Sequence, residues 1–182
     1  NPGDESSLSD EKRQTQILQD GLRAKLLVAF QNGRGYFEGT TRPGAQLGRT
    51  ADEIFRGMLE YAVPQLYPKL QMVTGVTLKG PESDEILKSA NLNSLSAVFY
   101  EGDNGLGLVA KEGSKFTINA RAPIAKEVLD KMQADFAYGN KVTGRSLEDH
   151  FGGLGYGWDR EFVVLTLASL LRGGLVEVTH QG

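Results

Sequence analysis

The chain has 182 residues, of which 40% are hydrophobic and 24% charged, and its formal net charge at pH 7 is −3. This composition is typical of a globular protein with one large domain or two small ones, which folds without disulfides or metals. The mild acidity argues against a surface built mainly on neutralising phosphates and leaves room only for a local basic patch.

The residue inventory excludes several further classes. There is no cysteine, which rules out disulfides, thiolate zinc sites and cysteine nucleophiles and fits a reducing compartment. No apolar run reaches the ~18–20 residues of a membrane span, so we expect a cytoplasmic protein with no membrane contact. The chain begins NPGDESS without an initiator methionine, which we interpret as a piece of a longer polypeptide.

The first third predicts a helix, a hairpin arm and a second helix. Residues 1–16 are polar and predict a frayed lead-in. A helix should follow and end near the NGRG turn at residues 32–35, because four apolar residues fall on one face: Leu18, Leu22, Leu26 and Ala29. The aromatic and β-branched residues 35–44 predict a strand or a hairpin arm.

A capping-box sequence, TADE at residues 50–53, opens the second helix. We expect a kink at Pro64, an end at Pro68, and an inward face formed by Phe55, Met58, Leu59, Ala62 and Leu66. An extended connection then runs to Gly80–Pro81, where we place the boundary between a helix–strand–helix domain, residues 1–80, and a second domain, residues 81–182.

The second domain predicts a helix from residue 84, a hairpin turning at residues 111–114, and then three helices. The first starts at Pro123 and carries Ile124, Val128, Met132 and Phe136 on one face. The next covers residues 146–151, and the third runs from a cap at Asp159 to Gly173–Gly174, followed by a strand at residues 175–180. This order resembles a winged helix, so the predicted fold class is α+β, mostly helical, with a C-terminal winged-helix-like module.

Neither glycine-rich stretch fits a nucleotide loop. The G-x-G-x-x-G pattern that starts at Gly153 fails because Trp158 occupies its last position, and the segment follows a helix instead of a strand. The near-match at Gly105 and Gly107 leads into a hairpin, so no helix N-terminus would meet a pyrophosphate. We therefore assign no cofactor-binding residue, and we interpret the glycines as a tight reversal. Tyr156 and Trp158 should bury their rings against the helices, and their polar tips should find backbone partners.

Acid–base and metal chemistry have one weak candidate, the run Glu148, Asp149 and His150. A small enzyme using these three residues is a hypothesis that we keep open. Consecutive helical residues point in different directions, however. We therefore interpret the run as the solvated end of a short helix and assign no catalytic or metal-binding residue.

DNA reading is the function that a winged helix suggests. The expected recognition helix, residues 159–172, offers only Arg160 and Arg172 for bases or phosphates, and Arg145 lies in the preceding helix. Residues 123–182 carry six Lys or Arg against eight Asp or Glu. Because a helix that is apolar on nearly every side is normally enclosed by protein, we favour a packing or partner-docking module and keep DNA binding as the alternative.

The segment VTGRSLEDHFGGLGYGWDREFVVLTLASLLRGGLVEV, residues 142–178, resembles a block in the large P-loop ATPase of the BREX phage-defence system, the BrxC/PglY family. Three sets of residues match in turn: Gly144, Leu147 and Phe151; Tyr156, Gly157 and Trp158; and Val163, Leu167, Leu170, Leu171, Gly174 and Val176. Upstream, AFQNGRGYFEGTTRPG and ADEIFRGMLEYAVPQLYPKL are similar to further family segments. The resemblance covers the chain from about Leu22 onward.

This resemblance implies a region outside the ATPase core of a bacterial antiviral complex that distinguishes methylated host DNA from invading DNA. ATP and Mg²⁺ would belong to the parent protein, and the partners would be its other domains or other BREX subunits. The family's Walker residues have no counterpart here, so the resemblance carries no catalytic site onto this chain.

Overall fold

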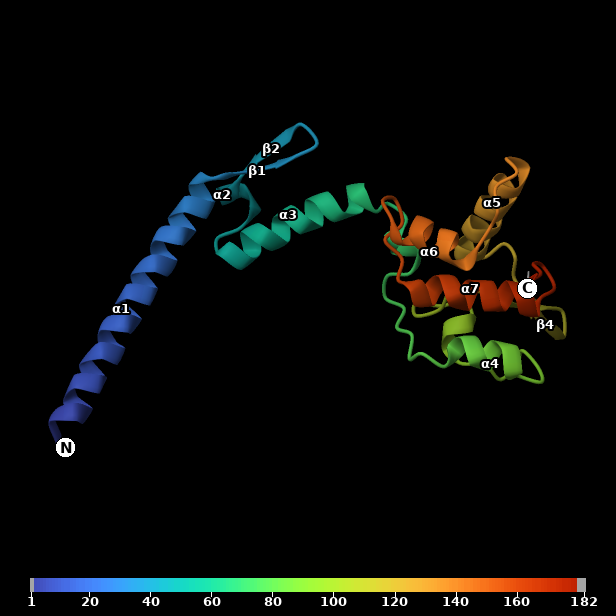
Figure 1. Cartoon of the computed structure of the whole chain (residues 1–182), viewed down its shortest axis with the longest axis horizontal. Coiled ribbons are helices and arrows are strands. Elements are labelled where there is room, and N and C mark those ends of the chain that lie inside the picture. The colour runs from blue at the N-terminus through green and yellow to red at the C-terminus, as the bar shows by residue number, and fades with distance from the viewer. Residues whose placement is uncertain (1, 180–182) are drawn as a thin grey trace. The chain divides into compact units, whose positions relative to one another are not determined.

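The computed structural model describes the backbone of residues 2–179 and the side chains of residues 10–179. The fold is α+β and mostly helical, as predicted. Its internal contacts form two units, residues 1–65 (unit 1) and residues 66–182 (unit 2) (Figure 1). We placed the boundary at residues 80–81. In the structure, residues 66–80 group with unit 2 because Val73 is part of its core and Leu78 packs against that core.

Unit 1 is built from three helices and a hairpin. They are α1 (Pro2–Asn32), β1 (Arg34–Phe37), β2 (Thr40–Pro43), α2 (Gly44–Leu47) and α3 (Ala51–Leu66). The lead-in that we predicted as frayed is helical from Pro2 onward, while Asn1 lies outside the described residues. The hairpin is confirmed, with Arg34 opposite Pro43 and left-handed backbone at Glu38 and Gly39, as a tight two-residue turn requires.

The cap of α3 follows its sequence closely. The Thr50 hydroxyl accepts the Glu53 N–H at 3.2 Å, and the Glu53 carboxylate accepts the Arg49 N–H at 2.7 Å. The carboxylate thus reaches back one residue further than in a standard capping box. The helix continues through Pro64 and ends at Leu66, before Pro68.

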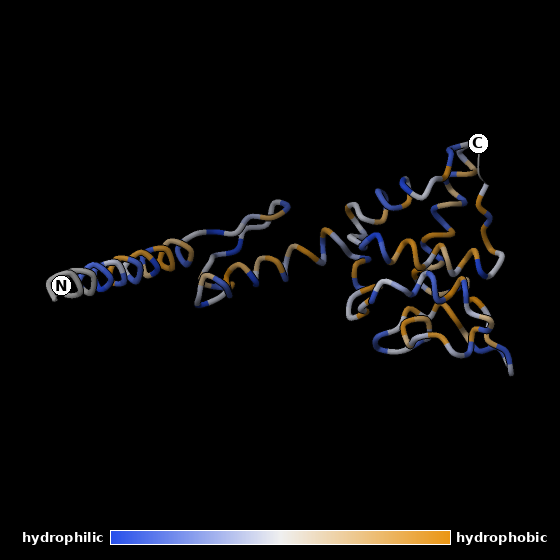
Figure 2. Tube along the Cα trace, turned by 60° about the horizontal axis from the view of Figure 1, so that its bottom comes forward, coloured by the Kyte–Doolittle hydropathy of each residue, from blue (hydrophilic) through white to orange (hydrophobic). Residues whose placement is uncertain are grey.

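The predicted inward face of α3 is wrong for Phe55 and Leu59, which are exposed. Ile54 is the one buried large hydrophobic residue among residues 10–65, and Leu18, Leu22 and Leu26 on the predicted apolar face of α1 are also exposed. Figure 2 shows hydrophobic residues recurring along the second half of α1 and along α3. The periodicity identified the apolar faces correctly, but unit 1 supplies too little structure to cover them.

Unit 2 contains the core of the protein. Its elements are η1 (Leu70–Met72), α4 (Glu82–Lys88), η2 (Ala97–Phe99), β3 (Val109–Glu112), β4 (Lys115–Ile118), α5 (Pro123–Ala137), α6 (Gly144–Gly152) and α7 (Arg160–Arg172). The hairpin predicted around residues 111–114 is confirmed as β3 and β4, with Val109 opposite Ile118.

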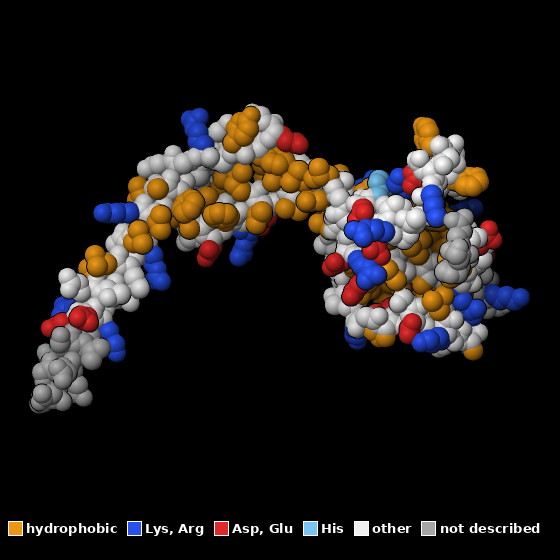
Figure 3. All heavy atoms as spheres, viewed as in Figure 1, with side chains coloured by type: hydrophobic (Ala, Val, Ile, Leu, Met, Phe, Trp, Pro, Cys, Tyr) orange, Lys and Arg blue, Asp and Glu red, His pale blue; other side chains and the backbone are white. Residues whose placement is uncertain are grey.

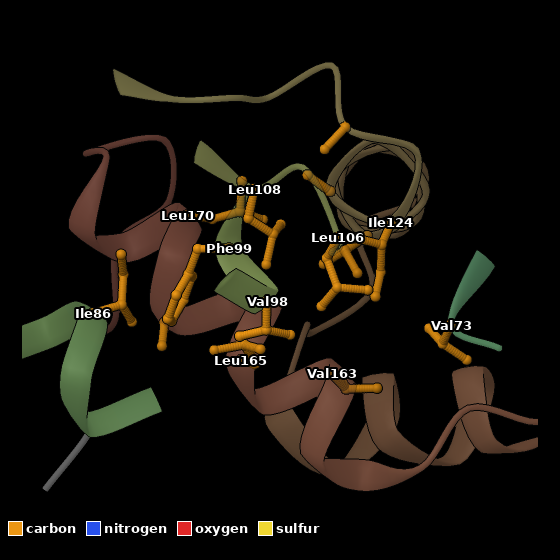
Figure 4. Packing of buried hydrophobic residues seen from close by; sticks show 14 of the residues in the cluster. Val73, Ile86, Val98, Phe99, Leu106, Leu108, Ile124, Val163, Leu165 and Leu170 are labelled. Atoms are coloured by element: carbon orange, nitrogen blue, oxygen red, sulfur yellow. The ribbon is translucent and has the colours of Figure 1, made fainter. Parts of the chain in front are cut away.

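The core of unit 2 gathers around α7. Figure 4 shows side chains from α4, η2, the 106–108 segment and α5 converging on those of α7. Phe99 and Leu108 are fully buried there, as are Val163 and Leu170 on α7 itself. Because α7 contacts α4, α5, α6 and β4, it is the central element that the other segments cover.

Local signals set the helix ends of unit 2. Pro123 occupies the first turn of α5, as predicted. Thr143 and Ser146 form a capping box at the start of α6. At the end of α7, Gly174 has φ +67°, and Leu175 donates its N–H to the Leu170 carbonyl at 3.0 Å, which together close the helix in a Schellman motif.

One predicted face in unit 2 is only partly buried, and one predicted strand is wrong. Phe136, the last residue of the face predicted for α5, is 81% exposed, because residues 136–141, the last turn of α5 and the turn that follows, are all exposed beyond the core. Residues 175–179 form no strand, and His180, the last residue of the predicted strand, lies outside the described residues. The Schellman motif already uses the Leu175 N–H, and β4 pairs only with β3 among the described strands.

Within the described residues, no helix is both long enough and apolar enough to cross a lipid bilayer.

Candidate functional site: the aromatic–ionic cluster

The loop between α6 and α7, which carries the Tyr156–Gly157–Trp158 sequence, needs glycine for two different reasons. Gly155 and Gly157 both have positive φ, +94° and +65°, which side chains disfavour. At Gly157 there is also no space, since a Cβ there would lie 2.8 Å from the Tyr67 ring. The glycine content is therefore explained by the turn and by its close approach to residue 67.

The backbone amides of this loop are engaged within the chain. Gly155 donates to the Leu66 carbonyl at 2.8 Å, and Trp158 donates to the Phe151 carbonyl at 2.8 Å. The amides of Gly153, Tyr156 and Gly157 also donate to nearby carbonyls. A phosphate cradle needs such amides free to point at the ligand, so the loop does not fit an ATP phosphate group.

Four rings form the aromatic part of the site. Trp158, only 2% exposed, stacks on Phe151 at 4.8 Å between centroids, and Tyr156 meets both rings edge-on. His150 lies against Phe151 and Tyr156. The Trp158 indole N–H donates to the Lys69 carbonyl at 3.0 Å, which confirms the expected backbone partner for its polar tip.

An ion pair completes the site. The Lys69 ammonium pairs with the Glu127 carboxylate, whose other oxygen accepts the Tyr156 hydroxyl at 2.7 Å. The Tyr156 hydroxyl therefore bonds to a carboxylate and not to the backbone partner that we expected. We call the set Lys69, Glu127, His150, Phe151, Tyr156 and Trp158 the aromatic–ionic cluster. It joins the start of unit 2 to α5, α6 and the loop before α7.

The surroundings shift the pKa values of three groups. Burial would raise the pKa of Glu127, but the hydrogen bonds from Lys69 and Tyr156 outweigh it and hold the pKa below its ordinary value. Burial, reinforced by the Glu127 carboxylate, raises the pKa of Tyr156 to about 12. Burial, with Lys131 nearby, lowers the pKa of His150, against the opposing pull of Asp135 and Glu127.

The cluster ties together residues that are far apart in the chain. Both oxygens of Glu127 are engaged, one by the Lys69 ammonium and one by the Tyr156 hydroxyl, while His150 is exposed. The hollow of about 140 Å³ beside the first turn of α7 is lined by Glu82, Arg160 and their neighbours, and by no member of the cluster.

Replacing Glu127 with glutamine should lower the free energy of unfolding at pH 7 by about 1–3 kcal/mol, because Lys69 loses its charged partner. The folded-state pKa of Glu127 is depressed, so its contribution is fully present above the unfolded value of 4.5 and is lost as the pH falls through the folded value. Urea unfolding at pH 3–7 should therefore show the two proteins converging at low pH. A constant difference across that range would contradict the pairing.

The run Glu148, Asp149 and His150 does not converge on one point. Glu148 accepts from the Arg160 side chain at 2.9 Å, Asp149 faces Arg145 at 4.0 Å, and His150 packs on aromatic rings. In the part of the chain that the structure describes, no group of three or more His, Asp or Glu residues is placed to hold a metal ion.

The three arginines proposed for DNA or partner contact lie apart. Arg160 and Arg172 occupy opposite ends of α7, about 18 Å apart at 1.5 Å rise per residue, and Arg172 donates to the Ser89 carbonyl at 3.0 Å. Arg145 and Arg160 each have the acidic neighbour described above. Between Arg160 and Arg172, residues 162–170 of α7 include no exposed residue. Helix α7 therefore presents no continuous face to a nucleic acid.

Comparison of the chain with models of known families, with curated protein sequences and with solved structures gives no match.

The sequence identifies three of the six cluster residues, places His150 at the solvated end of a short helix, and gives no sign of Lys69 or Glu127. Phe151, Tyr156 and Trp158 were identified as a structural motif, and Gly144 and Gly157 were grouped with them; Gly144 is the first residue of α6. Lys69 and Glu127 are 58 positions apart, and no spacing rule joins them. The one available signal was chemical, since a buried tyrosine hydroxyl needs a partner.

Proposed function

We propose that this chain is a non-catalytic region of a cytoplasmic BREX-type ATPase, serving antiviral defence as a structural and protein-interaction module. The proposal rests on the resemblance of residues 142–178 to that family and on one structural observation. The observation is that α7, the helix that a DNA-reading module would expose, has no exposed residue from 162 to 170. A helix placed in this way is enclosed by its own unit and offers no free face to a nucleic acid.

The winged-helix comparison is part of this proposal. Helices α5, α6 and α7 follow the order of the three helices in that fold, and the hairpin β3–β4 precedes them. ATP and Mg²⁺ would bind the ATPase core of the parent, because the amides of the glycine loop here are already engaged within the chain.

Unit 2 has exposed aromatic rings that its own core does not use. Phe136 and Tyr138, at the end of α5, are 81% and 85% exposed, and Leu154 in the glycine loop is also exposed. Aromatic side chains at the surface are the residues that protein interfaces use most. We propose that Phe136 and Tyr138 contact another domain of the parent or another BREX subunit.

A binding measurement tests this assignment. The chain is immobilised and exposed in turn to the purified ATPase core of a BREX ATPase and to the other subunits of that complex. We expect binding to at least one of them, weakened at least about 10-fold by the double substitution Phe136→Ser and Tyr138→Ser. A double substitution at Lys111 and Lys115 on the hairpin, both to Ser, serves as the exposed control. If the chain binds none of these components, the proposal is overturned.

A gel shift separates this function from DNA binding. We expect no retention of duplex DNA even at 50 mM salt, where contacts to phosphates are strongest. Retention that declines steeply between 50 and 200 mM salt, and that is lost on replacing Arg160 and Arg172 with alanine, would favour the DNA-binding alternative.

A further inference from the structure

Unit 1 exposes a regular apolar row on α1. The row consists of Leu18, Leu22, Leu26 and Phe30, spaced four residues apart on one face of the helix. The exposed fractions of its three leucines are 69%, 59% and 47%. Such a row is normally covered by another apolar surface, and we call it the leucine row.

A hollow lies at the C-terminal end of this row. It has a volume of about 350 Å³ and is lined by side chains and glycine backbone from α1, β1, α2 and α3, among them Phe30, Ile54, Phe55 and Met58. Its floor is tightly built, since a Cβ at Gly44 would lie 1.9 Å from the Phe30 carbonyl oxygen. Phe55 meets Phe30 edge-on at 5.9 Å, and Leu59 is exposed one helical turn further along α3.

The two features belong to one continuous apolar surface. Figure 3 shows hydrophobic side chains gathered over α3 and the adjoining end of α1. The exposed parts of the leucine row together with Phe55 and Leu59 amount to roughly 600 Å² of apolar surface, against about 800 Å² per partner in a standard interface. This is the upper end of what a monomer exposes, and polar rim atoms would bring the contact to the standard size.

The spacing of the row allows a second copy of the chain to cover it. Four residues at equal intervals are symmetric about the midpoint between Leu22 and Leu26. In an antiparallel pair of α1 helices, Leu22 of one copy therefore lies opposite Leu26 of the other, and Leu18 lies opposite Phe30, at the edge of the hollow. One surface thus carries both the projecting side chains and the hollow that receives them, which is the condition for an isologous two-fold interface.

We propose that a second copy of this chain covers the leucine row, forming an antiparallel two-fold dimer through unit 1. Leu18 of each copy enters the hollow of the other. On α1, Asp20 and Arg23 form an ion pair, and the net charge of the chain is only −3. The inference uses unit 1 alone and is independent of the function proposed for unit 2.

Sedimentation equilibrium on the whole chain tests the dimer. We expect a dimer at concentrations of about 10 μM and a loss of dimer affinity of at least about 100-fold for Leu22→Glu, since the substitution acts twice in a symmetric interface. Ile17→Glu is the matched control, because Ile17 is equally exposed on α1 but lies off the row. Both variants should keep the helical circular dichroism of the original chain, and Leu26→Lys provides a second test should either one lose it.

The register has its own test, because the chain contains no cysteine. Copies carrying Leu18→Cys and copies carrying Ala29→Cys are oxidised separately and as a mixture. Antiparallel pairing predicts disulfide-linked dimers in the mixture only, since two Leu18 positions would lie about 18 Å apart along the axis. A monomer at 100 μM, a dimer insensitive to Leu22→Glu, an equal effect of Ile17→Glu, or cross-linking of Leu18→Cys copies alone would each overturn the proposal.

Discussion

Replacement of Trp158 by alanine is expected to lower the free energy of unfolding of unit 2 by about 3–5 kcal/mol. The indole is 2% exposed, stacks on Phe151 and meets Tyr156 edge-on. Its N–H also donates to the Lys69 carbonyl, so the substitution opens a cavity and leaves a partly buried acceptor without its donor. The loss therefore combines packing and hydrogen-bonding contributions at one position.

Urea unfolding followed by far-ultraviolet circular dichroism measures this effect, since Trp158 is the sole tryptophan and its fluorescence disappears with it. Tyr138→Ala is the matched control, because that ring is 85% exposed and its loss should change stability by under about 0.5 kcal/mol. A loss below about 1 kcal/mol for Trp158→Ala would show that the ring is not enclosed and that the aromatic–ionic cluster does not hold unit 2 together.

The second large effect concerns α7. Leu170→Ala should lower the free energy of unfolding by about 2–5 kcal/mol, because Leu170 has no exposed surface and packs in the core around α7 (Figure 4). Its neighbour Leu171 is 38% exposed, and Leu171→Ala should cost under about 1 kcal/mol.

The pair of adjacent leucines distinguishes an enclosed helix from an open one. Both residues have the same chemistry and the same helix propensity, so a difference between the two variants reports burial alone. Equal and small losses would mean that α7 is accessible along its length. Such a result would remove the main support for a packing module and would favour the DNA-binding alternative.

The sequence alone predicted the local events well. Pro123 begins α5 because its missing amide donor costs nothing there, and Gly174 ends α7 because only glycine readily adopts its positive φ. The β3–β4 hairpin was predicted, residues 35–44 were predicted as a strand or a hairpin arm, and the α7 sequence indicated an enclosed helix, which the structure confirms. These features depend on residues within a few positions of one another, where side-chain chemistry acts directly on the backbone.

The failed predictions for helix faces concerned which neighbour a face would meet. The periodicity of α1 and α3 identified apolar faces, but it carried no information on whether unit 1 supplies enough structure to cover them, and Leu22 and Phe55 are exposed. Phe136 continues the apolar face of α5 past the end of the core, for the same reason. Periodicity reports the face of a helix and not the length of its partner.

The sequence by itself determined the helices, the hairpins, their caps and the apolar character of α7, because each follows from short-range steric and hydrogen-bonding preferences. Only the tertiary structure decided that Lys69 and Glu127 meet at the Tyr156 hydroxyl, that the glycine-loop amides are consumed within the chain, and that the leucine row of α1 is left uncovered. These outcomes depend on contacts between segments far apart in sequence, which packing selects and which no local pattern encodes.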